Sequence, residues 1–208
     1  MDRAVSPQSS LKAASQRARI GTALLAFGLL SGPARADTQQ IVRSVCSQCH
    51  GLDGNSAVTT YPKLAGLQAS YIAKQIDEFI AGNRAHELMA PVIAKLTPDD
   101  IAGLATYFSQ QKPAPGVVGE PTLTEIGQLL YTIGNPATGL PSCDGCHGTD
   151  AKGGGRFPRL AGQHREYILK QLNDIKDGRR NSSPLMRAVT DRMNPLEMKA
   201  LAVYLSGL

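Results

Sequence analysis

Cys46-Ser47-Gln48-Cys49-His50 and Cys143-Asp144-Gly145-Cys146-His147 are two copies of one motif, and they contain all four cysteines of the chain. In C-x-x-C-H the two thiols lie about one helical turn apart, and a histidine follows directly. This pattern is the attachment signature of c-type haem. We therefore expect two haem c groups (iron), with thioethers to the cysteines and with His50 and His147 as proximal iron ligands.

Other uses of paired cysteines compete with haem attachment. A structural zinc site needs four ligands in one place, and a redox-active pair is typical of a thioredoxin-like βαβ unit. Four cysteines in an exported chain usually form two disulfides. The sequence supplies neither a zinc nor a thioredoxin setting, and the histidine directly after each pair favours haem.

The two motifs belong to a larger internal repeat. After each motif the chain carries an aromatic-Pro-basic-Leu-Ala-Gly segment, at 61–66 and at 157–162. We predict two domains, 37–112 and 120–208, called here the first and second repeat, with a Pro- and Gly-containing linker over 113–119. Other matched pairs are Tyr71 and Tyr167, Arg84 and Arg180, Met89 and Met186, and Tyr107 and Tyr204.

The apolar spacing predicts an all-α fold, in which a few helices of each repeat wrap around one haem. Thr97 and Asn194, each followed by Pro, predict the caps of two closing helices. A middle helix is expected over 72–79 and over 168–175, because apolar residues share one face there. A helix is also expected before each motif, and in the second repeat its buried face should carry Ile126, Leu129 and Leu130.

Composition agrees with a haem-centred core. Hydrophobic residues make up 42% of the 208 residues, which excludes a disordered chain, but aromatic residues make up only 5%. Units of about 75–90 residues are marginally stable as bare chains. A haem would supply each of them with a large apolar body to pack against.

The second axial ligand is predicted to be methionine. Met89 and Met186 each follow the motif histidine at the same spacing (89 − 50 = 186 − 147 = 39). A thioether is a soft ligand that raises the potential of haem iron. Methionine is also a common core residue, and Met193 and Met198 fit that role better. His86 and His164 are competing ligands, but the repeat supports neither, since Ser183 and Gln68 occupy the matched positions.

Several other residues have two open interpretations. A ligating imidazole usually donates its second N–H to a carbonyl group, so the carbonyls of Pro62 and Pro158 are either such acceptors or parts of simple turns. Four further side chains either bind haem propionates or face solvent: Tyr71, Tyr167, Arg84 and Arg180.

Residues 1–36 are predicted to be a signal peptide, cleaved after Ala36. Arg17 and Arg19 precede an apolar stretch over 20–30, which is too short to span a membrane, and Ala34-Arg35-Ala36 is a small-x-small cleavage site. We therefore expect a periplasmic protein, or a weak peripheral membrane association if the segment is retained. Removal leaves 22 − 5 = 17 basic and 17 − 1 = 16 acidic residues, so the net charge of +5 falls to +1 and a nucleic-acid partner is not expected.

Taken together, the duplicated motifs resemble those of the di-haem cytochrome c4 family of bacterial electron carriers. The resemblance implies two class I cytochrome c domains, with His50 paired with Met89 and His147 with Met186 on the iron. It also implies a quinol-oxidising complex as electron donor and a terminal oxidase as acceptor. The first repeat departs from the family at Leu67-Gln68, where the family often has Gln directly after Leu-Ala-Gly.

The expected function is one-electron transfer at each haem between respiratory reductases and terminal oxidases, without enzymatic catalysis. With histidine and methionine both bound, the iron has no free position for a substrate. The alternative is the cytochrome subunit of a periplasmic dehydrogenase, of the flavocytochrome type. A di-haem peroxidase is disfavoured, because such an enzyme needs one displaceable ligand and the chain has two matched methionines.

Overall fold

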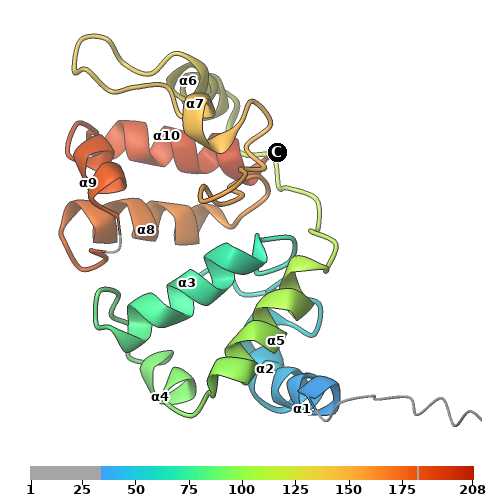
Figure 1. The fold of residues 1–208 in the computed structure, drawn as a ribbon. Coiled ribbons are helices and arrows are strands. Elements are labelled where there is room, and N and C mark those ends of the chain that lie inside the picture. Colours follow the sequence, from blue (N-terminus) through green and yellow to red (C-terminus); the bar gives the residue numbers. More distant parts are fainter. Residues whose placement is uncertain (1–33, 182) are drawn as a thin grey trace, which may run out of the picture. The chain divides into compact units, whose positions relative to one another are not determined.

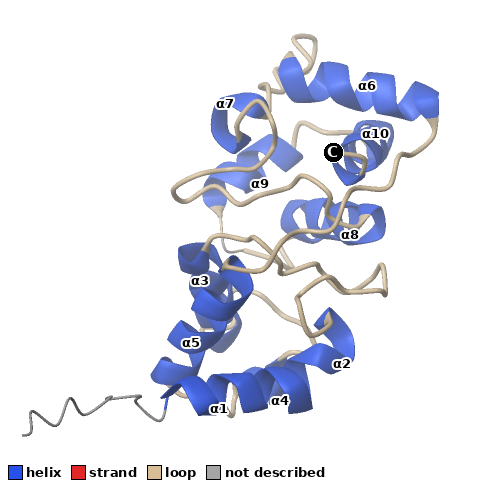
Figure 2. Cartoon of the chain, turned by 90° about the vertical axis from the view of Figure 1, so that its right-hand side faces the viewer, coloured by secondary structure: helices blue, strands red, loops and turns tan. Residues whose placement is uncertain are grey.

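Helices and loops make up the computed structural model, which describes residues 34–181 and 183–208 (Figure 1). Among these residues there is no sheet, only isolated bridges such as that between Arg84 and Arg180, and Figure 2 accordingly shows only helices and loops. The predicted all-α fold is confirmed. The predicted signal peptide over 1–36 lies outside the described residues except for its last three, which begin the first helix.

The first repeat is built from short helices around one longer pair. The described elements are α1 (Ala34–Ile41), a π-helix (Val42–Cys46), α2 (Ser47–His50), α3 (Ala69–Ile80), α4 (Ala90–Ile93) and α5 (Pro98–Ser109). The predicted middle and closing helices are therefore confirmed as α3 and α5. Thr97 caps α5 through a capping box, in which its hydroxyl accepts from the Asp100 N–H and the Asp100 carboxylate accepts from the Thr97 N–H.

The second repeat follows a similar order, but a loop over 133–143 separates its first helix from the motif helix. Its elements are α6 (Pro121–Thr132), α7 (Asp144–His147), α8 (Arg165–Lys176), α9 (Pro184–Thr190) and α10 (Pro195–Ser206). Asn194 and Glu197 form a capping box at the start of α10, as Thr97 and Asp100 do at α5. The two closing helices thus begin with the same local chemistry.

Each repeat has its own apolar core. Val42, Leu104 and Phe108 are among the buried residues of the first core. The second core includes Met193 and Met198, which the sequence analysis also assigned to packing. The predicted face of α6 is wrong at one position. Leu130 is buried and Ile126 packs against the core, whereas 58% of Leu129 is exposed because it lies on the outer side of that helix.

One close helix crossing in each repeat depends on a glycine. In the second repeat, a Cβ added to Gly127 of α6 would lie 2.2 Å from the carbonyl oxygen of Ala200 in α10. In the first repeat the glycine is on the other partner, because a Cβ added to Gly103 of α5 would lie 2.2 Å from Oγ1 of Thr38 in α1. A helix pair can approach this closely only where one side chain is absent.

The segment between the repeats is tied to both of them. The Ala114 N–H donates to Oδ1 of Asn55 in the first repeat at 2.8 Å, and the Val117 N–H donates to the Ser206 carbonyl in the second at 2.7 Å. Both repeats belong to one compact unit. No helix within the described ranges is long and apolar enough to cross a membrane.

Candidate functional site

Each motif ends in a four-residue helix that places the histidine toward its core. His50 closes α2 and His147 closes α7, and each is followed by a glycine with positive φ, 75° at Gly51 and 80° at Gly148. A left-handed residue lets the chain turn away immediately after the histidine, and glycine adopts it without steric cost. None of the four motif cysteines forms a disulfide, so all four remain available for haem attachment.

Both histidine rings are buried and held by a proline carbonyl. Only 6% of His50 and 6% of His147 is exposed. Nδ1 of His50 lies 2.9 Å from the Pro62 oxygen, and Nδ1 of His147 lies 3.0 Å from the Pro158 oxygen. A carbonyl oxygen only accepts, so each Nδ1 carries the proton. The second interpretation of the two prolines, that of simple turns, is therefore set aside.

This arrangement leaves Nε2 of each ring with a lone pair. With the proton on Nδ1, Nε2 of each ring is the unprotonated nitrogen and can donate its lone pair to a metal. Burial lowers the pKa of both His50 and His147, although the hydrogen bonds to Pro62 and Pro158 act in the opposite direction. Both rings therefore stay neutral at physiological pH, which is the form that coordinates a metal. The residues thus fit an iron ligand set.

The first cysteine of each motif is better suited to thioether formation than to binding a metal as a thiolate. Burial raises the pKa of Cys46 to about 11 and that of Cys143 to about 12. Zinc sites use deprotonated cysteine. The neutral, partly buried thiols of Cys46 and Cys143, each in a motif that ends in a neutral imidazole, therefore fit covalent attachment of a haem.

The repeated aromatic-Pro-basic segment packs next to each histidine. The Tyr61 ring centroid lies 6.5 Å from that of His50, and the Phe157 centroid lies 5.9 Å from that of His147. The same segment supplies the proline carbonyl that orients the ring. The repeat therefore encodes the support of the imidazole as well as the imidazole itself.

The two predicted methionine ligands occupy matched turns. Met89 is the N-cap of α4 and Met186 lies in the first turn of α9, and both are partly buried. The Met89 N–H donates to the His86 carbonyl at 3.1 Å, and the Met186 N–H donates to Oγ of Ser183 at 3.3 Å. His86 thus closes the turn before Met89 in the first repeat, and Ser183 closes the turn before Met186 in the second.

The two competing histidines have different surroundings. Nε2 of His164 lies 2.8 Å from the Ser56 carbonyl, and His164 is the N-cap of α8. His86 is partly buried, and its Nδ1 is buried without a hydrogen bond among the described residues. His164 therefore has a structural partner that joins the second repeat to the loop after the first motif.

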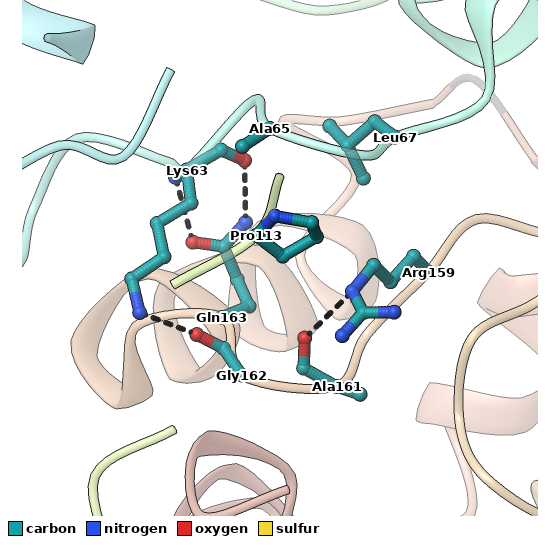
Figure 3. Close-up of a pocket in the computed structure, with 8 residues that line it drawn as sticks. All are labelled: Lys63, Ala65, Leu67, Pro113, Arg159, Ala161, Gly162 and Gln163. Atoms are coloured by element: carbon teal, nitrogen blue, oxygen red, sulfur yellow. Dashed lines mark hydrogen bonds between the residues drawn. The ribbon is translucent and has the colours of Figure 1, made fainter. Parts of the chain in front are cut away.

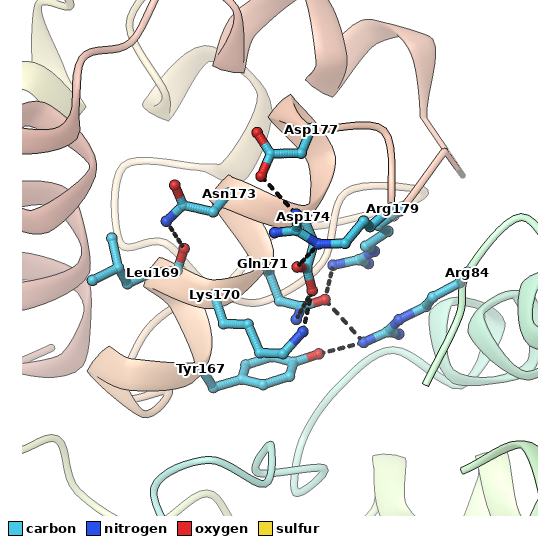
Figure 4. Close-up of polar contacts among 10 residues, drawn as sticks. Arg84, Tyr167, Leu169, Lys170, Gln171, Asn173, Asp174, Asp177 and Arg179 are labelled. Carbon is cyan, nitrogen blue, oxygen red and sulfur yellow. Dashed lines mark hydrogen bonds and ion pairs between the residues drawn. The ribbon is translucent and has the colours of Figure 1, made fainter. Parts of the chain in front are cut away.

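The tyrosine and arginine pairs form a polar network that links the repeats. Nη2 of Arg84 donates to the Tyr167 hydroxyl at 2.7 Å (Figure 4), and Nη2 of Arg180 donates to the Tyr71 hydroxyl at 2.6 Å. Both guanidinium groups also donate to the amide oxygens of Gln75 and Gln171. Neither arginine simply faces solvent, which removes one of the two interpretations left open by the sequence.

Three residues near the sites have contacts that the sequence alone does not predict. Ser56 is buried, and its hydroxyl donates to the Cys49 carbonyl at 2.8 Å. Gln68 and Gln163 each reach into the other repeat and accept a hydrogen bond from its main chain. The departure at Leu67-Gln68 was the available signal, because it moves a glutamine by one position between the two copies.

The fold and the paired sites define a class of small helical domains, each built around a cysteine pair and a buried, anchored imidazole. A family model described as Cytochrome c matches residues 36–112 and 125–208. Cytochrome c4 of Azotobacter vinelandii is 35% identical, over 87% of this chain and 92% of that relative. Cytochrome c4 of Thiocapsa roseopersicina is 40% identical, over 79% of this chain and 87% of that relative. A "thiosulfate dehydrogenase electron acceptor" of Thiomonas intermedia is 36% identical, over 78% of this chain and 77% of that relative.

A solved structure extends this similarity to three dimensions. Reduced recombinant cytochrome c4 from Pseudomonas stutzeri is 34% identical, with a TM-score of 0.79 over 86% of this chain and 100% of that chain. The chain therefore belongs to the cytochrome c4 family, with two cytochrome c domains in tandem and two haem c groups.

Proposed function

We propose that the protein is a periplasmic electron carrier in which each haem passes one electron between respiratory complexes. The observation that carries the proposal is the duplicated site, in which a buried histidine beside a cysteine pair has its Nδ1 fixed by a carbonyl. Such a ligand holds its orientation when the iron changes charge. Axial ligands, burial and hydrogen bonding are the means by which a protein sets the potential of a haem.

The proposed ligand set is the same in both repeats. Cys46 and Cys49, and likewise Cys143 and Cys146, form the thioethers. His50 and Met89 bind one iron, and His147 and Met186 bind the other. With both protein ligands in place, no position on the iron would remain for a substrate, and the protein would transfer electrons without catalysing a substrate reaction.

Leucine variants of the methionines test the ligand set. Met89→Leu and Met186→Leu should each remove about half of the charge-transfer band that methionine gives with oxidised haem iron, and the double variant should remove all of it. Met193→Leu is the matched control, because Met193 is a core residue of the second repeat with 3% exposure. A band that survives in the double variant would contradict the assignment of both methionines.

The proposed partners are a quinol-oxidising complex as donor and a terminal oxidase as acceptor. Contacts between redox proteins are small and short-lived, which suits a carrier that alternates between two partners. In membranes stripped of soluble cytochromes, the pure protein should restore electron flow from quinol to oxygen in proportion to its concentration. No restoration would contradict this pair of partners. Rapid consumption of hydrogen peroxide by the pure protein would indicate an enzyme instead.

A second candidate function is that of cytochrome partner to a periplasmic dehydrogenase. The observation that favours it is the 36% identity to a protein whose name states that it accepts electrons from thiosulfate dehydrogenase. Addition of a thiosulfate dehydrogenase and thiosulfate should then reduce both haems faster than quinol-oxidising membranes do. Purification with a flavin-containing subunit would instead indicate the flavocytochrome type.

The proposed location and domain boundaries have direct tests. Cell fractionation should place the protein in the periplasm, and intact mass should show a chain that begins at Asp37. Limited proteolysis should cut first within 113–119 if the two repeats are separate domains, 37–112 and 120–208. A chain that retains residues 1–36 would instead be found with the membrane fraction.

A further inference from the structure

A single peptide group in each repeat connects the proximal histidine to the other repeat. Pro62 O accepts from His50, and the N–H of the same peptide, at Lys63, donates to Oε1 of Gln163 at 2.8 Å. Gln163 belongs to the second repeat and is 8% exposed. Figure 3 shows its amide lying against the Lys63 main chain.

The second repeat has the reciprocal arrangement. Pro158 O accepts from His147, and the N–H of that peptide, at Arg159, donates to Oε1 of Gln68 in the first repeat at 3.2 Å. The two glutamines do not occupy matched positions, because Gln163 aligns with Leu67 and Gln68 aligns with His164. Two non-equivalent residues therefore reach equivalent peptides.

The orientation of each amide is fixed by its partners. Nε2 of Gln163 donates to the Lys63 carbonyl at 2.9 Å, while its Oε1 also accepts from the His164 N–H at 3.0 Å. Nε2 of Gln68 donates to the Lys152 carbonyl at 3.0 Å. In each case the oxygen faces N–H groups and the nitrogen faces a carbonyl, so the opposite orientation would lose these bonds. The cavity beside Gln163 has a volume of about 10 Å³, room for no more than one water.

The two hydrogen bonds of one peptide strengthen each other. Resonance joins the C=O and N–H of a peptide unit, and bonds in a chain polarise one another by roughly 10–30% each. When Gln163 accepts the hydrogen bond from the Lys63 N–H, the Pro62 oxygen therefore becomes a better acceptor for the His50 N–H. A stronger bond at Nδ1 makes the imidazole a more basic ligand. A more basic ligand stabilises the oxidised iron and lowers the reduction potential.

We propose that Gln163 and Gln68 are positioning residues that set the potential of the haem in the opposite repeat. Gln163 acts on the first haem through Lys63, Pro62 and His50, and Gln68 acts on the second through Arg159, Pro158 and His147. The Gln163 bond is shorter and more buried, so its effect is the larger. The inference rests on the proposed iron ligation by His50 and His147.

The test is the reduction potential of each haem in the intact, haem-loaded protein, with the two haems distinguished by their NMR methyl resonances. In Gln163→Leu the first haem should become easier to reduce, and the equilibrium constant for its reduction should rise about twofold. At about 59 mV per tenfold, this corresponds to a reduction potential higher by about 18 mV. The second haem should not change. The Nδ1 proton of His50 should also shift upfield, as expected for a weaker hydrogen bond. Gln68→Leu should give a smaller rise, at the second haem only.

Two further variants separate this effect from a loosened contact. Lys63→Met removes the 2.7 Å bond from Nζ to the Gly162 carbonyl but keeps the Lys63 N–H, so it should not raise the potential of the first haem. Gln163→Glu keeps an acceptor oxygen and should not raise it either. Three results would overturn the inference. The potential of the first haem could rise as much in Lys63→Met as in Gln163→Leu, or Gln163→Leu could shift the potentials of both haems equally. The NMR shift of the His50 Nδ1 proton could also stay unchanged in Gln163→Leu. A protein without covalent haem would overturn the proposed function. A haem-loaded protein whose potentials do not respond to these variants would overturn only the inference about Gln163 and Gln68.

Discussion

The Arg180 guanidinium of the second repeat donates a 2.6 Å hydrogen bond to the Tyr71 hydroxyl of the first. Only 9% of Arg180 is exposed, and its hydrogen-bonding side-chain partners among the described residues are neutral. A buried charge is costly unless hydrogen bonds replace the water around it. Tyr71 is therefore a main support of a cation that joins the two repeats.

Removal of the Tyr71 hydroxyl should destabilise the protein. In Tyr71→Phe we expect the free energy of unfolding to fall by about 1–3 kcal/mol, because a buried charged donor, Nη2 of Arg180, loses one of its two acceptors. Tyr167→Phe should cost less, since Arg84 is more exposed than Arg180. Urea unfolding followed by circular dichroism measures both. Tyr107→Phe is the control, because its hydroxyl bonds the Leu52 carbonyl within one repeat, and a loss there as large as in Tyr71→Phe would contradict the role of the network.

A buried carboxylate in α8 should make stability depend on pH. Asp174 is 6% exposed and accepts from Lys170 and, at 2.9 Å, from Arg179 (Figure 4). Burial opposes its ionisation, but these two cations hold its pKa below the usual value. A carboxyl with a lowered folded pKa stabilises the fold above its unfolded pKa of about 3.9, and this contribution is lost as the pH falls through the folded pKa.

Asp174→Asn should therefore unfold more easily at pH 7, by about 1–3 kcal/mol, and the difference from the natural protein should shrink below about pH 4. Urea titrations at several pH values measure it. Asp191→Asn is the matched control, because Asp191 pairs with Arg187 on the surface and should change stability by less than about 1 kcal/mol. A pH-independent loss in Asp174→Asn would show that the charge of Asp174 is not the cause.

The crossing of α6 and α10 should not tolerate a side chain at Gly127. Alanine favours a helix over glycine by about 1 kcal/mol, but its Cβ would lie 2.2 Å from the Ala200 oxygen. We therefore expect Gly127→Ala to lower the melting temperature, at a net cost of about 1–3 kcal/mol. Gly154→Ala is the control, because a Cβ there meets nothing within 4 Å. A melting temperature that rises in Gly127→Ala would mean that the helices cross further apart.

The sequence was sufficient for features that depend on local chemistry. Pro following Thr97 or Asn194 predicts the start of a closing helix, and the haem motif carries its own histidine. The sequence was insufficient where neighbours in three dimensions decide which side chains are buried. Leu129 has the spacing of the buried face of α6, but its side chain lies on the exposed side of that helix. The hydrogen-bond partners of Tyr71 and Gln163 lie in the other repeat. The shift at Leu67-Gln68 marks the glutamines as a difference between the copies, but no local pattern specifies the partners that they reach.

Every function proposed for this chain requires that it holds two haems covalently. The most direct measurement is the intact mass of denatured protein from a host that matures c-type cytochromes, together with a thiol titration. We expect the mass of residues 37–208 plus two haems, with no free thiol. A mass without haem and four reactive thiols, at Cys46, Cys49, Cys143 and Cys146, would contradict it.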